Sequence, residues 1–250
     1  MKKTKAKGAS GVRLDKFLSV TATATRSETR RAAKKGEILV DGVPVGDPAT
    51  DVDERTAAVV FRGVPVIYQK YHYILLNKPE GVVSATEDGG PTVLALLPEK
   101  YTVMGLFPCG RLDKDTVGLL LLTNDGDTAH RLLSPRRHVQ KRYRFAAERP
   151  LTEAEADAFR AGLTLSDGTK TAPAGIELDA GGASGVITLT EGKYHQIKRM
   201  MGALGNRITM LERISFGPLD LPTDLPRGAW RPLTEKEKAA LLAAAGNTPV

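Results

Sequence analysis

A carboxylate at the junction of a polar turn and a buried strand is the feature of this sequence best suited to chemistry. Residues 110–126 read GRLDKDTVGLLLLTNDG, so that Asp113 and Asp115 come shortly before the apolar run that starts at Val117. A strand can hold such a carboxylate rigidly at the edge of a cleft, where it can serve as a nucleophile or a base. An Asp before a strand is also a common turn former that bonds local N–H groups. Both interpretations of Asp113 fit the residues.

Two other side chains could complete such a site. Lys198 lies on a predicted helix over residues 194–204, whose other face is an apolar stripe that includes Ile197 and Met200. A cation fixed in this way opposes the rise in pKa that burial imposes on a carboxylate, although a solvated lysine fits the pattern too. Tyr143 lies in a basic stretch, and it could be a platform for a nucleobase or a core tyrosine of a strand.

Neither a metal nor a cofactor is predicted. The chain has four His and one Cys, and they are spread too widely for the spacing of a zinc site. Residues 124–127 lack the glutamate and ligand series of a calcium loop, and no Gly-rich phosphate loop is present. A metal-dependent sugar-transfer enzyme that uses Asp113 and Asp115 as an Asp-x-Asp pair is one alternative.

The positive charge is concentrated at one end of the chain. The net charge is +7, and residues 1–36 hold 11 Lys and Arg against two Asp and Glu, whereas the other residues hold 25 against 27. A second stretch, residues 131–144, has six Lys and Arg and no acid. Such a local excess indicates a polyanionic partner, with nucleic acid ahead of an anionic membrane. A solubilising tail is the alternative.

The composition is that of an ordinary soluble protein. With 250 residues, of which 41% are hydrophobic and 26% charged, the chain suits one large domain or two unequal ones. No apolar run approaches the roughly 18 residues of a membrane span, and no apolar segment follows the N-terminal lysines as in a secretory signal. Cys109 has no partner for an internal disulfide. We therefore expect a cytoplasmic protein without a membrane partner.

Residues 12–58 have the pattern of a small module. Apolar residues at helical spacing predict a first helix from residue 14. Thr25 and Glu28 have the spacing of a capping box that opens a second helix with a cationic face. The pair Asp41 and Gly42 between two apolar runs predicts a tight hairpin. This module resembles the S4 domain (αL type), in which the helix pair lays its basic face against RNA phosphates.

The rest of the chain predicts strands and helices in irregular alternation. The strands are expected over residues 73–76, 119–122 and 186–190, and the helices over residues 91–97, 152–163, 194–204 and 234–245. This arrangement indicates an α+β fold rather than a doubly wound sheet.

Four segments resemble the motifs of the pseudouridine synthases, in the branch typified by the rRNA enzyme RsuA. They are 73–81 (YILLNKPEG), the catalytic segment 110–126, a second motif at 134–143 (SPRRHVQKRY) and a third at 191–200 (EGKYHQIKRM). Together with the S4-like module, the resemblance covers roughly residues 12–240. It implies a catalytic domain built on a mixed, mainly antiparallel sheet with flanking helices.

The resemblance also implies roles for the candidate residues. Asp113 matches the essential aspartate that acts at C1′ of the target uridine, and Tyr143 matches the tyrosine that stacks on the uracil. Lys198 matches the basic residue paired with the aspartate, which is arginine in much of the wider superfamily. Isomerisation of uridine breaks a C1′–N1 bond and forms a C1′–C5 bond, with the aspartate acting as a nucleophile or through a glycal route. The residues do not choose between these routes.

Domain limits and RNA contacts follow from these observations. We expect a basic flexible arm (1–11), an S4-like RNA-binding domain (12–58), a linker (59–70), the catalytic domain (71–240) and a C-terminal tail (241–250). The residues expected to contact RNA are Arg13, Lys16, Arg26, Arg30, Arg31, Lys34, Lys35, Arg111, Arg136, Arg137, Lys141 and Arg142.

The expected function is isomerisation of a specific uridine in rRNA by a monomer, on naked RNA or on a ribosome-assembly intermediate. Residues 85–88 ahead of 91–93, and the start of the second motif at 134–136, resemble the 16S rRNA enzyme more than its 23S relatives. This favours 16S rRNA as the substrate. The alternatives are a 23S rRNA enzyme of the same branch and a non-catalytic S4-type RNA-binding or ribosome-assembly factor.

Overall fold

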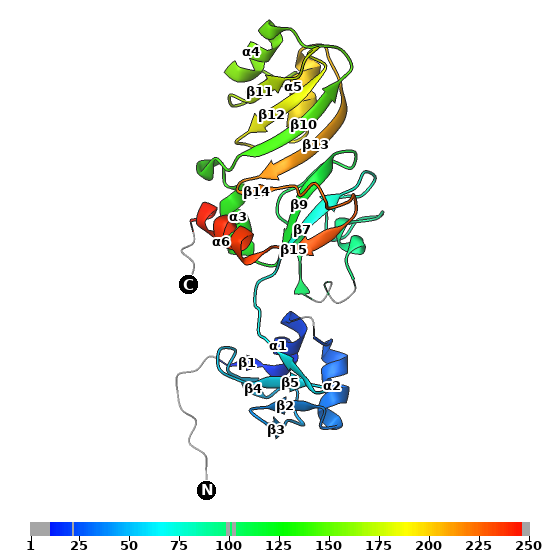
Figure 1. Ribbon diagram of the computed structural model, residues 1–250, viewed down its shortest axis with the longest axis vertical. Coiled ribbons are helices and arrows are strands. Elements are labelled where there is room, and N and C mark those ends of the chain that lie inside the picture. The colour runs from blue at the N-terminus through cyan, green and yellow to red at the C-terminus, as the bar shows by residue number, and fades with distance from the viewer. Residues whose placement is uncertain (1–10, 22, 99–100, 102–103, 247–250) are drawn as a thin grey trace. The chain divides into compact units, whose positions relative to one another are not determined.

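The computed structural model describes residues 11–21, 23–98, 101 and 104–246. The chain divides into two compact units (Figure 1). The first contains the chain up to residue 72 together with residues 97–106, and the second contains residues 73–96 and everything from residue 107 onward. The predicted basic arm lies, except for Gly11, outside the described residues. No helix in the described part of the chain is long and apolar enough to cross a bilayer.

The first unit packs two short helices on small sheets. Its elements are β1 (Val12–Arg13), α1 (Leu14–Val20), α2 (Arg26–Lys34), β2 (Ile38–Val40), β3 (Val43–Pro44), β4 (Asp51–Val52), β5 (Val59–Phe61) and β6 (Val64–Val66). At the start of α2 the Thr25 hydroxyl accepts a hydrogen bond from the Glu28 N–H, and the Glu28 carboxylate accepts one from the Thr25 N–H. The apolar faces meet in one core around Phe17, Leu18 and Ile38. The predicted helix pair, capping box and hairpin are confirmed.

The predicted linker over residues 59–70 is wrong for its first half. Strands β5 and β6 lie there, and they extend the hairpin into a four-stranded sheet with the order β3-β2-β5-β6. Val59 and Phe61 are buried in the core of the first unit. The turn between the strands uses Arg62 and Gly63, both with positive φ. This short period-2 pattern was hidden by Gly63 and Pro65, which break the alternation.

The second unit is a mixed sheet with the order β11-β12-β10-β13-β9-β7-β15. Its strands are β7 (Tyr73–Lys78), β8 (Phe107–Pro108), β9 (Val117–Thr123), β10 (Lys141–Ala147), β11 (Gly175–Leu178), β12 (Ser184–Leu189), β13 (Ile208–Phe216), β14 (Leu219–Asp220) and β15 (Trp230–Pro232). Neighbouring strands are antiparallel except for the pair of β9 and β13, which is parallel. The expected α+β fold with a mainly antiparallel sheet is confirmed.

Helices flank this sheet. They are the 3₁₀ turns η1 (Val93–Leu96) and η3 (Pro135–Arg137), and the helices α3 (Gly126–Leu133), α4 (Glu153–Ala161), α5 (Gln196–Ala203) and α6 (Glu235–Ala244). α3 and α6 contribute Ala129, Leu132 and Leu241 to a core that they share with β7 and β9. Residues 241–246 are therefore part of the domain and not of a tail, because Leu241 and Ala245 are fully buried. Residues 247–250 lie outside the described residues.

The parallel pair of β9 and β13 depends on a glycine at its closest approach. Gly118 pairs with Arg213 and has a φ of +100°, and a Cβ at residue 118 would lie 2.3 Å from the Arg213 carbonyl oxygen. No side chain fits between these two backbones. Because Asp113 precedes β9 and Arg213 lies on β13, this contact fixes two parts of the second unit that are far apart in sequence.

We expect Gly118→Ala to lower the free energy of unfolding by about 3 kcal/mol or more, since it combines a backbone clash with an unfavourable φ. Urea unfolding followed by circular dichroism measures this. Gly126→Ala is the matched control, because Gly126 begins α3 in open space, and it is expected to be neutral or slightly stabilising. A Gly118→Ala protein as stable as the control would contradict the close approach.

Candidate active site

An ion pair brings the segments 110–126 and 191–200 of the sequence together. Lys198, on α5, places its Nζ 2.8 Å from Asp113 Oδ2 and 2.5 Å from Asp115 Oδ1. His195 Nε2 lies 3.3 Å from the other oxygen of Asp113. The Asp113 side chain is 24% exposed, so it is held by its partners and still open to a ligand. The residues predicted as an acid and its paired cation therefore meet in one place.

The charges in this cluster support one another. Burial works against the charged form of Lys198, but its hydrogen bonds with Asp113 and Asp115 outweigh burial and raise its pKa. Burial likewise works to raise the pKa of Asp115, but the hydrogen bond and charge of Lys198 lower it overall. Lys198 is thus a cation at neutral pH and pairs with both carboxylates.

The turn that carries Asp113 is held from below by a buried lysine. Lys78, at the end of β7, has no exposed surface, and its ammonium group donates to the carbonyl oxygens of Asp113 (3.0 Å) and Thr116 (2.9 Å). It lies at similar distances from the carbonyls of Pro79 and Lys114. Burial lowers the pKa of Lys78 to about 8. Its function in the fold is to tie together the backbone carbonyls of this turn, where the Asp113 and Lys114 carbonyls also accept a backbone N–H.

The same segment reaches the turn at two more points. The Gly81 N–H donates to the Lys114 carbonyl at 2.9 Å. The Ser84 hydroxyl donates to the Leu112 carbonyl at 2.9 Å and accepts from the Leu112 N–H at 3.1 Å. The first motif, residues 73–81, and Ser84 beyond it therefore support the Asp113 turn, and neither lines the pocket that contains Asp113.

The N-terminal end of α5 is fixed by a polar network. Glu191 accepts hydrogen bonds from Gln196 (2.7 Å), Lys193 (2.7 Å) and the Ala172 N–H (2.8 Å). His195, the residue before α5, has a left-handed backbone with φ of 46°, which is uncommon outside glycine. This conformation accompanies the placement of the His195 ring beside Asp113.

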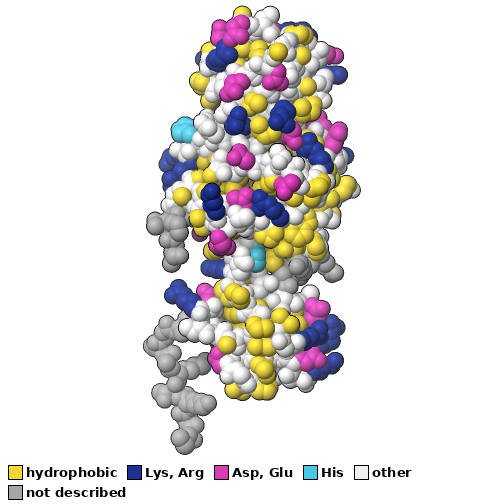
Figure 2. Space-filling model, viewed as in Figure 1, with side chains coloured by type: hydrophobic (Ala, Val, Ile, Leu, Met, Phe, Trp, Pro, Cys, Tyr) yellow, Lys and Arg dark blue, Asp and Glu magenta, His cyan; other side chains and the backbone are white. Residues whose placement is uncertain are grey.

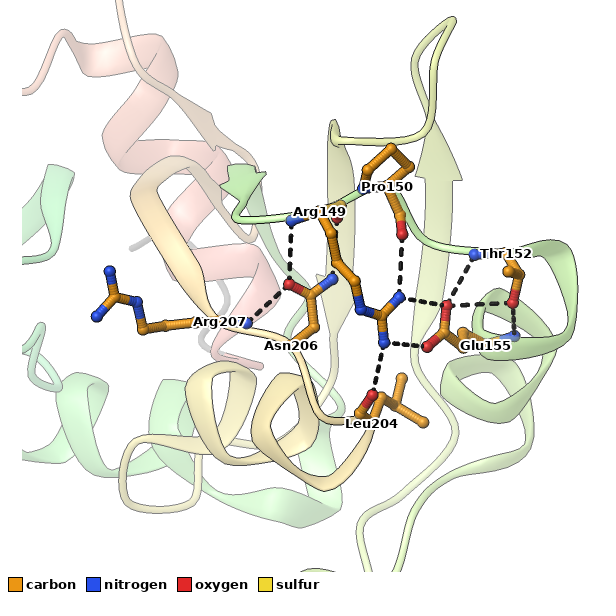
Figure 3. A network of polar contacts seen from close by, with 7 residues as sticks. All are labelled: Arg149, Pro150, Thr152, Glu155, Leu204, Asn206 and Arg207. Atoms are coloured by element: carbon orange, nitrogen blue, oxygen red, sulfur yellow. Dashed lines mark hydrogen bonds and ion pairs between the residues drawn. The ribbon is translucent and has the colours of Figure 1, made fainter.

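The C-terminal end of α5 is fixed by a second network (Figure 3). Arg149, which follows β10, donates to both carboxylate oxygens of Glu155 and to the Leu204 carbonyl at the end of α5. The Asn206 side chain accepts from the Arg149 and Arg207 N–H groups and donates to the Arg149 carbonyl. These bonds tie α5 to the ends of β10 and α4. Lys198 therefore sits on a helix that is anchored at both ends.

A pocket opens beside the ion pair. Its lining includes Asp113, His195 and Lys198, and also Tyr143, which is buried on β10. The three residues expected to carry catalysis thus line one pocket, and it lies within the second unit. The ring of Tyr194 stacks on that of His195 at a centroid distance of 3.8 Å, and Tyr194 is exposed.

The residues predicted to contact RNA are mostly exposed. On α2 and next to it these are Arg26, Arg30, Arg31, Lys34 and Lys35, and in the second unit they are Arg111, Arg136, Arg137 and Arg142. Lys16 is exposed, and Arg13 is exposed but paired with Asp15 at 2.8 Å. The prediction that Lys141 contacts RNA phosphates at the surface is wrong, because this side chain is buried in the pocket lining. In the strand it falls on the inward side, like Tyr143 two residues later.

Sequence reasoning missed Lys78 and Arg213. Lys78 belongs to the YILLNKPEG segment. The feature that could have indicated its burial is a lysine directly after a strand pattern, with no acid beside it in the sequence. Arg213 is a charged residue on the inward side of β13, a strand that was not predicted. His195 was also not among the residues predicted for the site, although it lies 3.3 Å from Asp113.

Residues 72–203 match the family of RNA pseudouridylate synthases, and residues 12–56 match the S4 domain. The chain belongs to the RNA pseudouridylate synthase family. This RNA pseudouridylate synthase is 43% identical to an RNA pseudouridine synthase of Bacillus subtilis, YtzG, over 90% of this chain and 96% of that protein. It is 39% identical to ribosomal small subunit pseudouridine synthase A of Vibrio cholerae, over 92% of this chain and 99% of that protein.

A crystal structure of a pseudouridylate synthase has the same fold. It superposes with a TM-score of 0.65 at 33% identity, and the match covers 92% of this chain and 99% of that one. The family, the S4 domain and the isomerase activity expected from the resemblance are confirmed.

For this RNA pseudouridylate synthase, we expect Lys78→Met to lower the single-turnover rate about 100-fold, because the Asp113 turn loses its internal support and a shift of about 1 Å has that effect. RNA affinity should stay within about threefold. Lys114→Met is the control, since that side chain is exposed on the same turn. Equal rates for the two variants, measured with enzyme in excess over RNA, would rule out a positioning role for Lys78.

Proposed function

We propose that this enzyme isomerises one specific uridine of 16S rRNA, with Asp113 acting at the ribose. The supporting observation is the ion pair of Asp113 and Lys198 in a pocket that Tyr143 also lines. The 16S assignment is supported by relatives over nearly their whole length, since the proteins of Vibrio cholerae and Escherichia coli are each named ribosomal small subunit pseudouridine synthase A.

The chemistry assigns one task to each of three residues. Asp113 acts on C1′, either by attack at that carbon or as a base toward C2′ in a glycal route. Lys198 holds and directs the carboxylate through its ion pair. Tyr143 supports the uracil after the nucleotide has been turned out of its stack, because an aromatic ring replaces the lost stacking.

The first unit is proposed to bind the RNA backbone through α2. Its exposed cations come from positions one turn apart, and Figure 2 shows Lys and Arg side chains gathered over this helix. The helix has a single acid, Glu28, which is engaged in the capping box. Phosphates are the natural ligands of such a face, and the contacts carry no sequence information. We further propose a cytoplasmic monomer.

Three alternatives differ from this proposal. A 23S rRNA enzyme would use the same site on another RNA. A non-catalytic RNA-binding factor has no use for an anchored Asp113–Lys198 pair. A metal-dependent enzyme needs Asp113 and Asp115 as free ligands, whereas both carboxylates are bonded to Lys198.

We expect Asp113→Asn to abolish pseudouridine formation, because an amide is neither a nucleophile nor a base. The test expresses each variant in a strain that lacks the gene and maps pseudouridine in its 16S and 23S rRNA. Wild type and the control Asp220→Asn, an exposed carboxylate on β14, should restore one 16S site. A restored site in 23S alone would reassign the substrate, and modification by Asp113→Asn would remove Asp113 from the chemistry.

We expect the double variant Arg30→Ala, Lys34→Ala to reduce the salt dependence of RNA binding. Each lost phosphate contact lowers the slope of log K against log salt concentration by about 0.7 to 0.9. Filter binding at several salt concentrations measures this. Arg55→Ala with Arg62→Ala is the control, because those arginines are exposed in the same unit but lie outside α2. Identical slopes for the two double variants would exclude the α2 face from RNA binding.

A further inference from the structure

The pocket beside Asp113 contains two buried cations that the ion pair does not use. Arg213, on β13, is 2% exposed and Lys141, on β10, is 7% exposed. Arg213 Nε donates to the Leu119 carbonyl at 2.7 Å, and Lys141 Nζ donates to the Val139 carbonyl at 3.1 Å. Both side chains line the pocket. Within the described residues, neither has a carboxylate partner at ion-pair distance.

These cations leave hydrogen-bonding capacity unused. Arg213 Nη2 is buried without a hydrogen-bond partner among the described residues, and so is the Oγ1 of Thr116, another pocket residue. Burial, together with the charge of Arg213, lowers the pKa of Lys141 to about 8. A buried unpaired cation destabilises a protein, and unpaired buried donors are rare. Two together in a pocket indicate a site that receives its anion from outside the chain.

Lys141 and Arg213 lie on the same face of the sheet as Tyr143. Lys141 and Tyr143 are two residues apart on β10 and both face inward, whereas Arg142 between them is exposed. Arg213 is the cross-strand partner of Tyr143, so that their side chains share one face of the sheet. Lys141 Nζ and the Arg213 guanidinium lie 5.7 and 5.3 Å from the centre of the Phe216 ring. Because Tyr143, Lys141 and Arg213 all line the same pocket, a planar ring that contacts Tyr143 would share that pocket with both charges.

We propose that Arg213 and Lys141 bind the uracil ring and stabilise it as an anion while it is detached from the ribose. Their N–H groups donate to the ring oxygens, and the Thr116 hydroxyl is a third possible partner. This goes beyond the Asp113–Lys198 pair, which acts at the sugar, and it holds for either route of the reaction.

The electron balance calls for such a site. When the C1′–N1 bond breaks, its electron pair stays with the uracil and spreads over N1 and the two carbonyl oxygens. The ring turns and C5 forms the new bond to C1′. The C5 proton then leaves to a base and N1 takes up a proton from solvent, so that the product is an isomer of the substrate. Fixed donors aimed at charge that develops only during reaction are among the most effective catalytic devices.

A backbone phosphate is the other anion that RNA offers. Its position is less suitable, because C1′ must face Asp113 and the ring must face Tyr143 for the proposed chemistry. Donors beside Tyr143 then meet the ring and not the phosphodiester on the far side of the ribose. The two anions also differ in timing, since the phosphate is charged before the reaction and the uracil only during it.

The test removes each charge separately and compares rate with affinity. RNA from a strain lacking the gene, grown with [5-³H]uridine, is mixed with excess enzyme, and tritium release gives the rate constant at saturation. Lys141→Met and Arg213→Met should each lower this constant about 100-fold or more, in the range known for a lost oxyanion donor. The Kd from filter binding should change by less than about threefold. Arg144→Met, a control on the exposed face of β10, should change neither.

A weaker Kd with an unchanged rate at saturation would overturn the proposal in favour of a phosphate site, and so would full activity of both variants. If circular dichroism shows that Arg213→Met does not fold, Lys141→Met alone decides the test. Methionine is apolar and similar in length to lysine, so the side chain at residue 141 can still pack on Phe216. Inactive wild-type enzyme on this RNA would instead refute the proposed function, so the two failures are distinguishable.

A leaving-group test separates catalysis from a structural role. RNA transcribed with 5-fluorouridine contains a ring whose anion is more stable, because fluorine withdraws electrons. Mass spectrometry of nucleosides measures the loss of 5-fluorouridine. The factor by which Lys141→Met slows this loss should be at least tenfold smaller than the factor by which it slows the reaction of uridine. An equal penalty on both RNAs would show that Lys141 only shapes the pocket.

Discussion

The attraction between Lys198 and the two aspartates is the interaction on which the rest of the site depends. A single ammonium group joins a turn before β9 to a helix more than 80 residues later in the chain. Either partner alone would be expensive to bury, because a carboxylate or ammonium ion loses hydration on leaving water. Together they form a charged pair that leaves part of the Asp113 side chain accessible.

The surrounding structure keeps the two partners at a fixed distance. Lys78 holds the turn through backbone carbonyls, so the position of Asp113 does not depend on its own side chain. Networks around Glu191 and Arg149 hold the two ends of α5. Supporting bonds of this kind restrict both the acid and its cation to a single geometry, which lowers the entropic part of the barrier.

The sequence predicts this site only in part, and the reasons are physical. Asp113, Tyr143 and Lys198 are recognisable because each lies in a segment with its own pattern, although spacing does not place them in one pocket. Lys141 looked like a surface base because a run of arginines surrounds it, yet strand alternation turns it inward. Arg213 carries no local signal, since its burial depends on pairing with strands that are distant in sequence. The strand at 64–66 was missed because Gly63 and Pro65 interrupt the alternation of its apolar residues.

The topology also determines when during synthesis the enzyme can first exist. Leu119 and Arg213, which bond across the parallel pair, are 94 residues apart, and β7 completes its pairing only with β15 near residue 230. Closing loops of this length is slow compared with local helix formation. A nascent chain can therefore present its basic N-terminal module long before it has a working pocket. The order of synthesis therefore delivers the basic helix α2 well before the strands that complete the pocket.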